Sequence, residues 1–336
     1  MQPPASSITE AALPGHPHLP EARMHLVRPT HPATATITAT RICTAGGRKA
    51  AGIVRHIELD ISRTPIAGNF LVGQSFGVLP PGEDSRGKSH ALRLYSIASP
   101  SFGEDGAGNV LATTVKRTIA ERQPQNERDD PDDHCLFMGV ASNFLCDLRV
   151  GDELAITGPQ GKRFLLPSQP EKHDYIFLAT GTGIAPFRGM VMELLTNPRG
   201  AVPSSIHLVM GAPYRSDLLY DDELRALAAA HPNFIYHTAI SREYQPHSPH
   251  GEYVHQVFSN RRDCFHPMLL SDRTLIYVCG ILGMQFGIYR EIIAAGAADA
   301  FLSISNDLDP AHAAAWSGDD VKRKVRPTAR MMLEVY

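Results

Sequence analysis

Four continuous apolar runs in the second half of the chain constrain its fold most strongly. Stretches with helical character follow these runs near residues 186–195, 219–230, 253–270 and 284–296. Buried strands that alternate with helices are typical of a parallel, doubly wound sheet with helices on both faces. We therefore expect an α/β domain over residues 169–336. The four runs are DYIFLAT (174–180), SIHLVMGA (205–212), NFIYHTAIS (233–241) and TLIYVCG (274–280).

The first half of the chain has a different pattern. Short runs rich in β-formers, such as GIVRHIELDI (52–61), LRLYSIAS (92–99) and NVLATTVKRT (109–118), are separated by Gly and Pro turns. Runs of this kind with frequent turns indicate antiparallel strands. We expect an antiparallel six-stranded β-barrel over residues 37–168, so the fold class is a two-domain β plus α/β protein.

Two segments do not fit either pattern. Residues 1–36 are rich in Pro, His and Ala without apolar periodicity, and we expect them to form a flexible arm. Glu10 and Glu21 argue against a transit peptide, because such peptides are poor in acidic residues. Residues 120–134 are strongly polar and are expected to form an exposed loop.

Composition excludes several classes of function. The 336 residues carry 32 Lys plus Arg against 35 Asp plus Glu, so there is no overall positive charge to hold nucleic acid. No window approaches the roughly 20 apolar residues that span a bilayer. The five cysteines form no CxxC pair, so we expect no zinc site, iron–sulfur cluster or other metal. The odd cysteine count without a secretory signal indicates a reducing, cytoplasmic location.

A glycine-rich turn lies where the first strand of the α/β half meets its first helix. The segment Ala179–Phe187 reads ATGTGIAPF. Glycines let the backbone approach a pyrophosphate, and a helix N-terminus offers unpaired N–H groups and a positive dipole end. Pro186 suits the first turn of the helix because it has no N–H to leave unpaired. The turn therefore predicts a dinucleotide-binding site.

Several motifs together resemble one family. Arg93-Leu94-Tyr95-Ser96, upstream of GTGIAPFRG (181–189), resembles the flavin signature of plant-type ferredoxin–NADP+ reductases, which are FAD-dependent and end in tyrosine. The resemblance runs from about residue 40 to 336 and implies an FAD-binding barrel followed by an NADP(H)-binding domain. It also leads us to expect that EVY is the natural end of the chain. The other motifs are VKR (115–117), GVASNFLCDLRVGDELAITGPQGKRFLLP (139–167), ISREY (240–244), VCG (278–280) and EVY (334–336).

The resemblance implies four catalytic positions. It places Ser96 beside flavin N5 and Cys279 against the nicotinamide ring, where the thiol positions the ring and is not a nucleophile. Tyr336 would cover the isoalloxazine face and yield when nicotinamide stacks. Glu334 would lie near Ser96 and support proton delivery.

The resemblance also implies a set of cofactor-binding residues. Arg93 can pair with the FAD pyrophosphate, and Tyr95 can lie against the isoalloxazine. Gly139–Leu145 is expected to open a helix with Ser142 as its N-cap, so that backbone amides meet the pyrophosphate. The expected set is Arg93, Leu94, Tyr95, Ser96, Thr114, Lys116, Gly139, Val140, Ala141, Ser142, Thr182, Gly183, Pro186, Ser241, Arg242, Tyr253, Cys279, Gly280 and Tyr336.

Two positions depart from the family pattern. Ala141 stands where the family commonly has Cys, and this change should not abolish binding. Ala120 stands where relatives often carry an aromatic residue that stacks on the FAD adenine. How this chain holds the adenine is therefore an open question.

The choice of NADP(H) over NAD(H) depends on groups that bind the 2′-phosphate. Ser241 and Arg242 follow the third apolar run, and Tyr253 comes shortly after. These residues match the family's phosphate clamp and its adenine-stacking tyrosine. We expect NADP(H) to be the nicotinamide cofactor.

The expected activity is electron exchange between NADP(H) and a separate one-electron carrier, ferredoxin or flavodoxin, by a monomer. Positive residues that could steer an acidic carrier are Arg86, Lys88, Lys116, Arg117 and the run 322–326. One alternative is a reductase component that supplies an oxygenase. A second alternative is a non-catalytic flavin- or nucleotide-binding subunit, which would predict a damaged hydride site.

Overall fold

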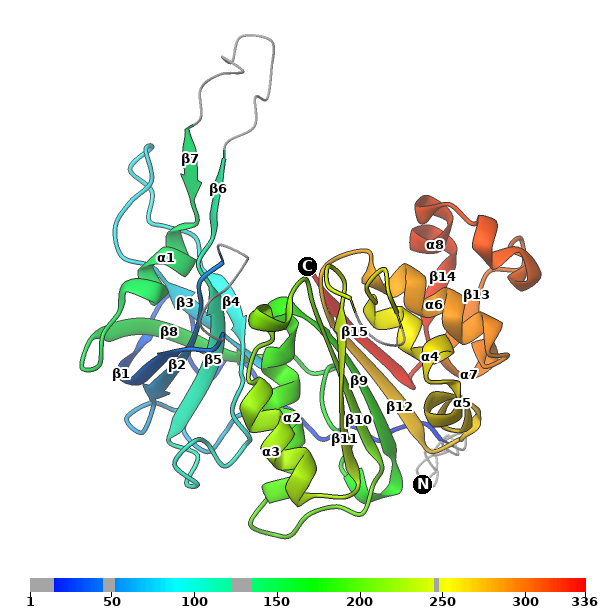
Figure 1. The fold of residues 1–336 in the computed structure, drawn as a ribbon. Helices are drawn as coiled ribbons and strands as arrows, with labels where there is room; N and C mark the ends of the chain where they lie inside the picture. Colours follow the sequence, from blue (N-terminus) through cyan, green and yellow to red (C-terminus); the bar gives the residue numbers. More distant parts are fainter. Residues whose placement is uncertain (1–14, 45–51, 122–134, 245–247) are drawn as a thin grey trace, which may run out of the picture.

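The computed structural model describes residues 15–44, 52–121, 135–244 and 248–336, which form a barrel and an open sheet side by side (Figure 1). The strands of the barrel end at Gln160, and those of the open sheet begin at Asp174. The boundary expected near residue 168 lies in the connection between them. Every helix in the described ranges is too short or too polar to cross a lipid bilayer.

An antiparallel barrel forms the first domain, as expected. Its six strands follow the order β4-β3-β8-β1-β2-β5. The ring closes where Ile97 pairs with Thr113 and the Ala98 N–H donates to the Ala112 carbonyl at 2.7 Å. The strands are β1 (Ala33–Ile42), β2 (Val54–Asp60), β3 (Ser75–Leu79), β4 (Arg93–Ser96), β5 (Val110–Lys116) and β8 (Glu153–Gln160).

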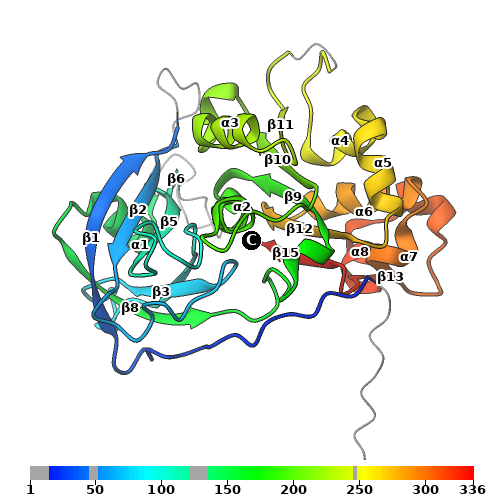
Figure 2. The ribbon, with the colours of Figure 1, turned by 90° about the horizontal axis from the view of Figure 1, so that it is seen from below.

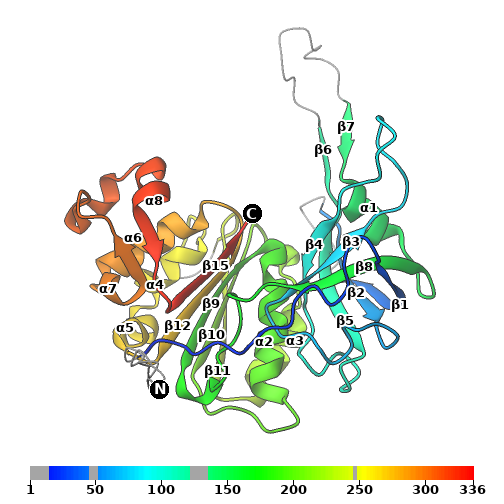
Figure 3. The same cartoon turned by 180° about the vertical axis from the view of Figure 1, so that it is seen from behind.

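A helix and a hairpin extend one end of the barrel. The helix is α1 (Val140–Asp147), and the hairpin pairs β6 (Ile119–Glu121) with β7 (Leu136–Met138). Seen from behind, the hairpin stands clear of the barrel beyond α1 (Figure 3). The loop expected over 120–134 is thus a strand at residues 120–121, and residues 122–134 lie outside the described part of the chain.

The second domain is a parallel sheet with helices on both faces, which confirms the expected doubly wound fold. Its strand order is β11-β10-β9-β12-β15, and every pairing is parallel. Alternate residues of each strand pack against opposite layers: Phe177 lies with α2 and α3, and Leu178 with α4, α5 and α6. The elements are β9 (Asp174–Thr180), α2 (Ile184–Thr196), β10 (Ile206–Ala212), α3 (Asp221–Ala230), β11 (Phe234–Ile240), α4 (Val257–Asn260), α5 (Arg262–Leu270), β12 (Thr274–Gly280), α6 (Met284–Ala294) and β15 (Met331–Val335).

The last part of the chain leaves the sheet and returns to it. A small unit follows α6, and β15 then runs back beside β12, so that the C-terminus lies between the two domains (Figures 1 and 2). This unit contains α7 (Ala298–Phe301), β13 (Leu302–Ile304), a 3₁₀ helix (Pro310–Ala315), α8 (Gly318–Lys324) and β14 (Val325–Pro327). Shorter 3₁₀ turns are Pro170–Lys172, Gly181–Gly183, Arg215–Asp217 and Val254–Gln256.

The flexible arm expected over residues 1–36 is wrong for residues 15–36. Val27 is buried in the barrel core and pairs with Gly158. Farther back, the His18 carbonyl accepts a hydrogen bond from the Ser168 N–H at 2.8 Å. The segment therefore runs along both domains, as Figure 2 shows. Sequence alone missed these contacts because their partners lie more than a hundred residues away. Residues 1–14 lie outside the described ranges.

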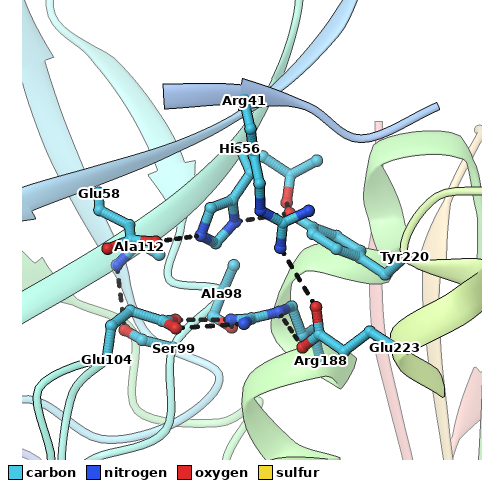
Figure 4. A network of polar contacts seen from close by, with 11 residues as sticks. Arg41, His56, Glu58, Ala98, Ser99, Glu104, Ala112, Arg188, Tyr220 and Glu223 are labelled. Carbon is cyan, nitrogen blue, oxygen red and sulfur yellow. Dashed lines mark hydrogen bonds and ion pairs between the residues drawn. The ribbon is translucent and has the colours of Figure 1, made fainter. Parts of the chain in front are cut away.

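A buried ion network joins the two domains (Figure 4). Arg188 of α2 donates to both carboxylate oxygens of Glu104, at 2.6 and 3.1 Å, and Glu104 belongs to the barrel. The Arg188 Nε donates to Glu223 of α3 at 2.7 Å. The side chains of Arg188 and Glu104 are only 5% and 13% exposed. Buried charges must be paired to be tolerated, so this contact fixes one domain against the other.

Tyr220 occupies the centre of the same interface. The guanidinium groups of Arg41 and Arg188 both lie over its ring, each 5.3 Å from the ring centroid. Its hydroxyl shares hydrogen bonds with Thr114 at 2.5 Å and with the His56 Nδ1 at 3.0 Å, both in the barrel. The Tyr220 backbone has a φ of 57°, a conformation that a non-glycine residue keeps only when its surroundings impose it.

Candidate active site at the strand ends

The turn after β9 forms one wall of the candidate site. It is a 3₁₀ turn over Gly181–Gly183, and α2 begins directly at Ile184. A Cβ on Gly183 would lie 2.2 Å from the Cys279 carbonyl oxygen, so only glycine fits there. The predicted residues Thr182, Gly183 and Pro186 are therefore brought against the end of β12.

The ends of β12 and β15 lie side by side in the next part of the site. Cys279 and Glu334 are partners in the parallel register, and Cys279 is 1% exposed. Burial raises the pKa of the Cys279 thiol well above its usual range, so the thiol stays protonated at neutral pH. Burial also raises the pKa of the Glu334 carboxyl to about 7. Gly280 has a φ of 146° and lies so close to Thr180 that a Cβ would clash.

The C-terminal tyrosine bridges these two loops. The Tyr336 hydroxyl hydrogen-bonds the Thr182 Oγ1 at 2.8 Å, and its backbone N–H donates to the Gly280 carbonyl at 3.0 Å. Its carbonyl accepts from the Leu282 N–H at 2.9 Å. The residue is nevertheless 63% exposed. A ring held by a few polar contacts at an open edge can be displaced by a ligand.

Strand β4 supplies the barrel's part of the site. Arg93 and Leu94 are exposed, while Tyr95 and Ser96 are half-buried. Burial raises the pKa of the Tyr95 hydroxyl to about 12. The Ser96 backbone is held on two sides, because it pairs with Ser75 of β3 and its carbonyl accepts from the Thr113 hydroxyl at 2.9 Å.

Small residues bring the barrel and the glycine-rich turn together. Ala185, at the start of α2, packs in one buried cluster with Ala98 and Ala112 of the barrel. One helical turn later, a Cβ on Gly189 would lie 2.5 Å from the Ser99 carbonyl oxygen. The end of β4, two residues before Ala98, therefore lies beside the first turn of α2. This close approach brings the segment after β4 against the first helix of the second domain.

The expected helix after Gly139 is present, but its start differs from the prediction. The N-cap is Gly139 and α1 begins at Val140, so the expected N-cap Ser142 lies within the first turn. The Ser142 hydroxyl donates to the Gly139 carbonyl at 3.2 Å and accepts from the Thr118 N–H at 3.1 Å. Ser142 thus ties the helix start to the base of the β6–β7 hairpin. Val140 is exposed and Ala141 is buried.

Two further predicted residues lie on β5. Lys116 is exposed at the end of the strand. The Thr114 side chain is 5% exposed, and its hydroxyl bonds Tyr220 at the domain interface. Thr114 therefore belongs to the interface between the domains, and its side chain is not open to a cofactor.

The barrel surface offers what a flavin dinucleotide requires. A large planar ring system requires apolar contact area, and a diphosphate requires a cation or backbone amides. The exposed Arg93 supplies a cation for the diphosphate, and the first turn of α1 supplies backbone amides. Apolar contact area for planar rings comes from side chains that are at least 44% exposed, namely Leu94, Ile119, Leu136, Phe137, Met138 and Val140. The residues present thus fit FAD.

The predicted phosphate clamp follows β11. Backbone N–H groups of Ser241 and Arg242 donate to the carbonyls of Ala212 and Pro213 at 3.0 and 2.9 Å, which ties the loop to the end of β10. The Arg242 side chain is exposed. Tyr253 is 61% exposed, and its ring is stacked with that of His255, with 6.0 Å between centroids. These side chains lie at the same sheet edge as the glycine-rich turn, because parallel strands end on one side.

One cluster elsewhere has the composition of a metal site. His207, His237 and Cys264 lie near one another. The two imidazoles, however, are 3.1 Å apart at their nitrogens with centroids 5.3 Å apart and planes 19° apart, so they lie end to end. That arrangement is an N–H···N hydrogen bond between neutral rings, since a tetrahedral ion requires nitrogen lone pairs that converge at an angle. Burial lowers the pKa of His207 to about 4 and that of His237 to about 3.

Comparison with known proteins identifies the family. Residues 177–289 match the family model of the oxidoreductase NAD-binding domain. The ferredoxin–NADP reductase of Synechocystis sp. is 35% identical over 87% of this chain and 68% of its own length. The Picosynechococcus sp. ferredoxin–NADP reductase is 39% identical over 70% of this chain and 57% of its own length. The root isozyme 1 from Arabidopsis thaliana is 37% identical over 80% of this chain and 69% of its own length.

Solved structures show the same fold. The ferredoxin–NADP+ reductase of Plasmodium falciparum, in its structure with 2′P-AMP, has a TM-score of 0.64. That alignment covers 93% of this chain and 99% of the other chain at 20% sequence identity. The two-domain arrangement described above is therefore that of a known fold.

Proposed function

The chain belongs to the ferredoxin–NADP reductase family, and from this premise we propose that it is a flavoprotein that exchanges electrons between NADP(H) and ferredoxin. The observation that carries the proposal is the approach of the β4 end to the glycine-rich turn through Ala98, Ala112 and Ala185. This approach supports the proposal, because a flavin bound along β4 would lie close to a nucleotide bound at the glycine-rich turn.

The barrel would hold FAD. When bound, FAD supplies the chemistry, because it exchanges a hydride with nicotinamide and single electrons with a carrier. Arg93 and the first turn of α1 would bind the diphosphate, and Tyr95 would lie along the isoalloxazine. The Ser96 hydroxyl would hydrogen-bond the reacting nitrogen of the ring, since its backbone is fixed by Ser75 and Thr113.

The strand ends of the second domain would receive NADP(H). Thr182 and Gly183 would contact its pyrophosphate, and Ser241, Arg242 and Tyr253 its 2′-phosphate and adenine. Buried, protonated Cys279 would support the nicotinamide ring by contact. Tyr336 would occupy the stacking position until nicotinamide displaces it, and its hydrogen bond to Thr182 sets part of the cost of displacement. Glu334 would hold or release a proton near neutral pH.

Positive charge near β4 would attract the acidic carrier, ferredoxin or flavodoxin. Arg86 and Lys88 are exposed in the loop that precedes β4. Two other candidates are less suited, because Arg117 is paired with Asp147, and Lys324 with Asp307 and Asp320. We further propose that the protein acts as a monomer in the cytoplasm, and the free state of the five cysteines supports a reducing compartment.

The proposal is tested by mixing the purified holoenzyme with NADPH and, separately, with NADH. Bleaching of the flavin absorbance is expected to be much faster with NADPH. An Arg242→Ala variant should lose roughly 10- to 100-fold of this preference, because a charged hydrogen bond to the 2′-phosphate contributes about 1.5–3 kcal/mol. Arg199→Ala, an exposed arginine in the loop that leads to β10, is the control. A protein without bound flavin, or one that prefers NADH, would contradict the proposal.

The Glu334 carboxyl predicts a pH dependence. Its pKa rises from an ordinary value near 4.5 to about 7 in the folded protein. The folded state therefore binds the proton more tightly than the unfolded state, and stability falls as pH rises between about 4.5 and 7 by at most about 3 kcal/mol. Glu334→Gln should remove this loss, so urea unfolding at pH 5.5 and at pH 8 should differ less than in the wild type. The exposed Glu153→Gln should leave the wild-type difference unchanged.

A further inference from the structure

The β6–β7 hairpin carries an aromatic side chain in an informative register. Ala120 of β6 lies directly opposite Phe137 of β7 in the antiparallel pairing. Directly opposed residues project their side chains from the same face, with Cβ atoms about 5 Å apart. The Phe137 ring therefore stands on the face of the hairpin that carries the Ala120 methyl group, and the small methyl leaves that ring open.

The ring is only half covered in the folded chain. Phe137 is 50% exposed, and its neighbours in the hairpin, Ile119, Leu136 and Met138, are also exposed. A three-residue strand pair buries too little apolar surface to need a phenylalanine for its own stability. An exposed cluster of large apolar side chains on a small hairpin is typical of a ligand-contact surface.

The hairpin lies next to the diphosphate-binding helix start. Gly139 follows Phe137 by two residues, which places their Cα atoms roughly 7 Å apart in an extended chain. The Gly139 N–H donates to the Thr118 carbonyl at 3.0 Å, and the Asn143 amide donates to the same carbonyl at 2.9 Å. The base of the hairpin is thus anchored to α1, and Figure 1 shows the hairpin rising beyond that helix.

The chemistry of FAD identifies what would meet this ring. Its diphosphate separates the isoalloxazine from an adenosine, so a molecule with its flavin at Ser96 and its diphosphate at α1 has its adenine beyond α1. A purine has two flat faces that stack on aromatic side chains. The opposite face of the hairpin lacks any aromatic side chain, because it carries Ile119, Glu121, Leu136 and Met138.

We propose that Phe137 is the stacking surface for the adenine of FAD, a role supplied from β7 because β6 has alanine at position 120. This inference rests on the proposed function, since it takes FAD as the bound flavin. Ala120 matters as much as Phe137, because its small side chain gives the adenine room to lie flat against the ring. The substitution to alanine in one strand is thereby compensated by the phenylalanine of the other.

The test compares FAD with FMN, which lacks the adenosine half. The full-length chain, freed of its flavin, is titrated with each flavin while flavin fluorescence is recorded. Phe137→Ala should weaken FAD binding roughly 10- to 100-fold, the range that loss of one base–aromatic stack produces. FMN binding should not change. Val150→Ala, which truncates an exposed apolar side chain in the loop between α1 and β8, is the control and should leave both affinities unchanged.

A rescue variant separates stacking from simple disturbance of the hairpin. The double variant Ala120→Phe with Phe137→Ala moves the ring across the hairpin to the same face and should restore most of the FAD affinity. The inference would be overturned if Phe137→Ala left both affinities unchanged or lowered both by the same factor. Either result would leave the proposed function standing. Failure of the wild-type chain to bind either flavin would overturn both.

Discussion

Replacement of Ser96 by valine is expected to slow flavin reduction by NADPH by about 100-fold or more, while FAD remains bound. Valine suits a strand and lacks the hydroxyl, but its side chain is one methyl group larger than that of serine. Ser96→Ala, which removes only the hydroxyl, is therefore measured beside it and should show the same loss. A side chain positioned to exchange a hydrogen bond or proton with the reacting group contributes on the order of 10²–10⁴-fold to the rate. The measurement is stopped-flow bleaching of the flavin band under single-turnover conditions.

The position of Ser96 explains why so large an effect is expected. Its backbone is paired with Ser75, and its carbonyl accepts the Thr113 hydroxyl, so the side chain starts from a fixed base. Preorganised groups act at full strength because nothing has to be reordered in the reaction. Ser85→Val, on the exposed loop before β4, should leave the rate unchanged. A Ser96→Val protein with full FAD content and a rate within about threefold of wild type would refute a catalytic role for this hydroxyl.

The parallel sheet could be predicted closely from the sequence. The runs 174–180 and 274–280 coincide with β9 and β12, because strands buried on both faces are apolar along most of their length. The glycine-rich turn was also recognisable, since steric contact with the neighbouring strand end excludes any side chain at Gly183. These are local signals, and the residues that produce them are adjacent in the chain.

Features that depend on distant partners could not be predicted. Ser142 has the chemistry of an N-cap, but its hydroxyl accepts from Thr118, on a segment that sequence alone does not bring beside it. Phe137 is separated from Ala120 by a segment whose length conceals their pairing. Glu104 and Arg188 carry no signal as individual charged residues. Their importance comes from burial, which only the assembled domains produce.

Replacement of Arg188 by leucine is expected to destabilise the protein by about 3–5 kcal/mol. The change leaves the Glu104 carboxylate buried at the domain interface without its bidentate partner, and removal of one member of a buried pair costs about this much. Urea unfolding measures the loss. Arg225→Leu is the matched control, because Arg225 pairs with Asp221 one helical turn away but is 53% exposed. That control should cost at most about 0.5 kcal/mol. A loss below about 1 kcal/mol for Arg188→Leu would contradict the buried-network interpretation.

A second substitution separates the cost of an isolated charge from the value of the contact itself. If the penalty in Arg188→Leu comes mainly from an unpaired carboxylate, then Arg188→Leu combined with Glu104→Leu should be more stable than the single variant, because no charge is left buried between the domains. The Ala98 carbonyl also loses a donor at 3.0 Å in both variants, so recovery should be incomplete. Flavin reduction by NADPH should be slow in the single variant and also in the double variant despite its recovered stability, because both lack the ion pair that orients α2 against the end of β4. Recovery of the rate together with stability would mean that the alanine contact alone sets the domain arrangement, and that the ion network contributes only to folding.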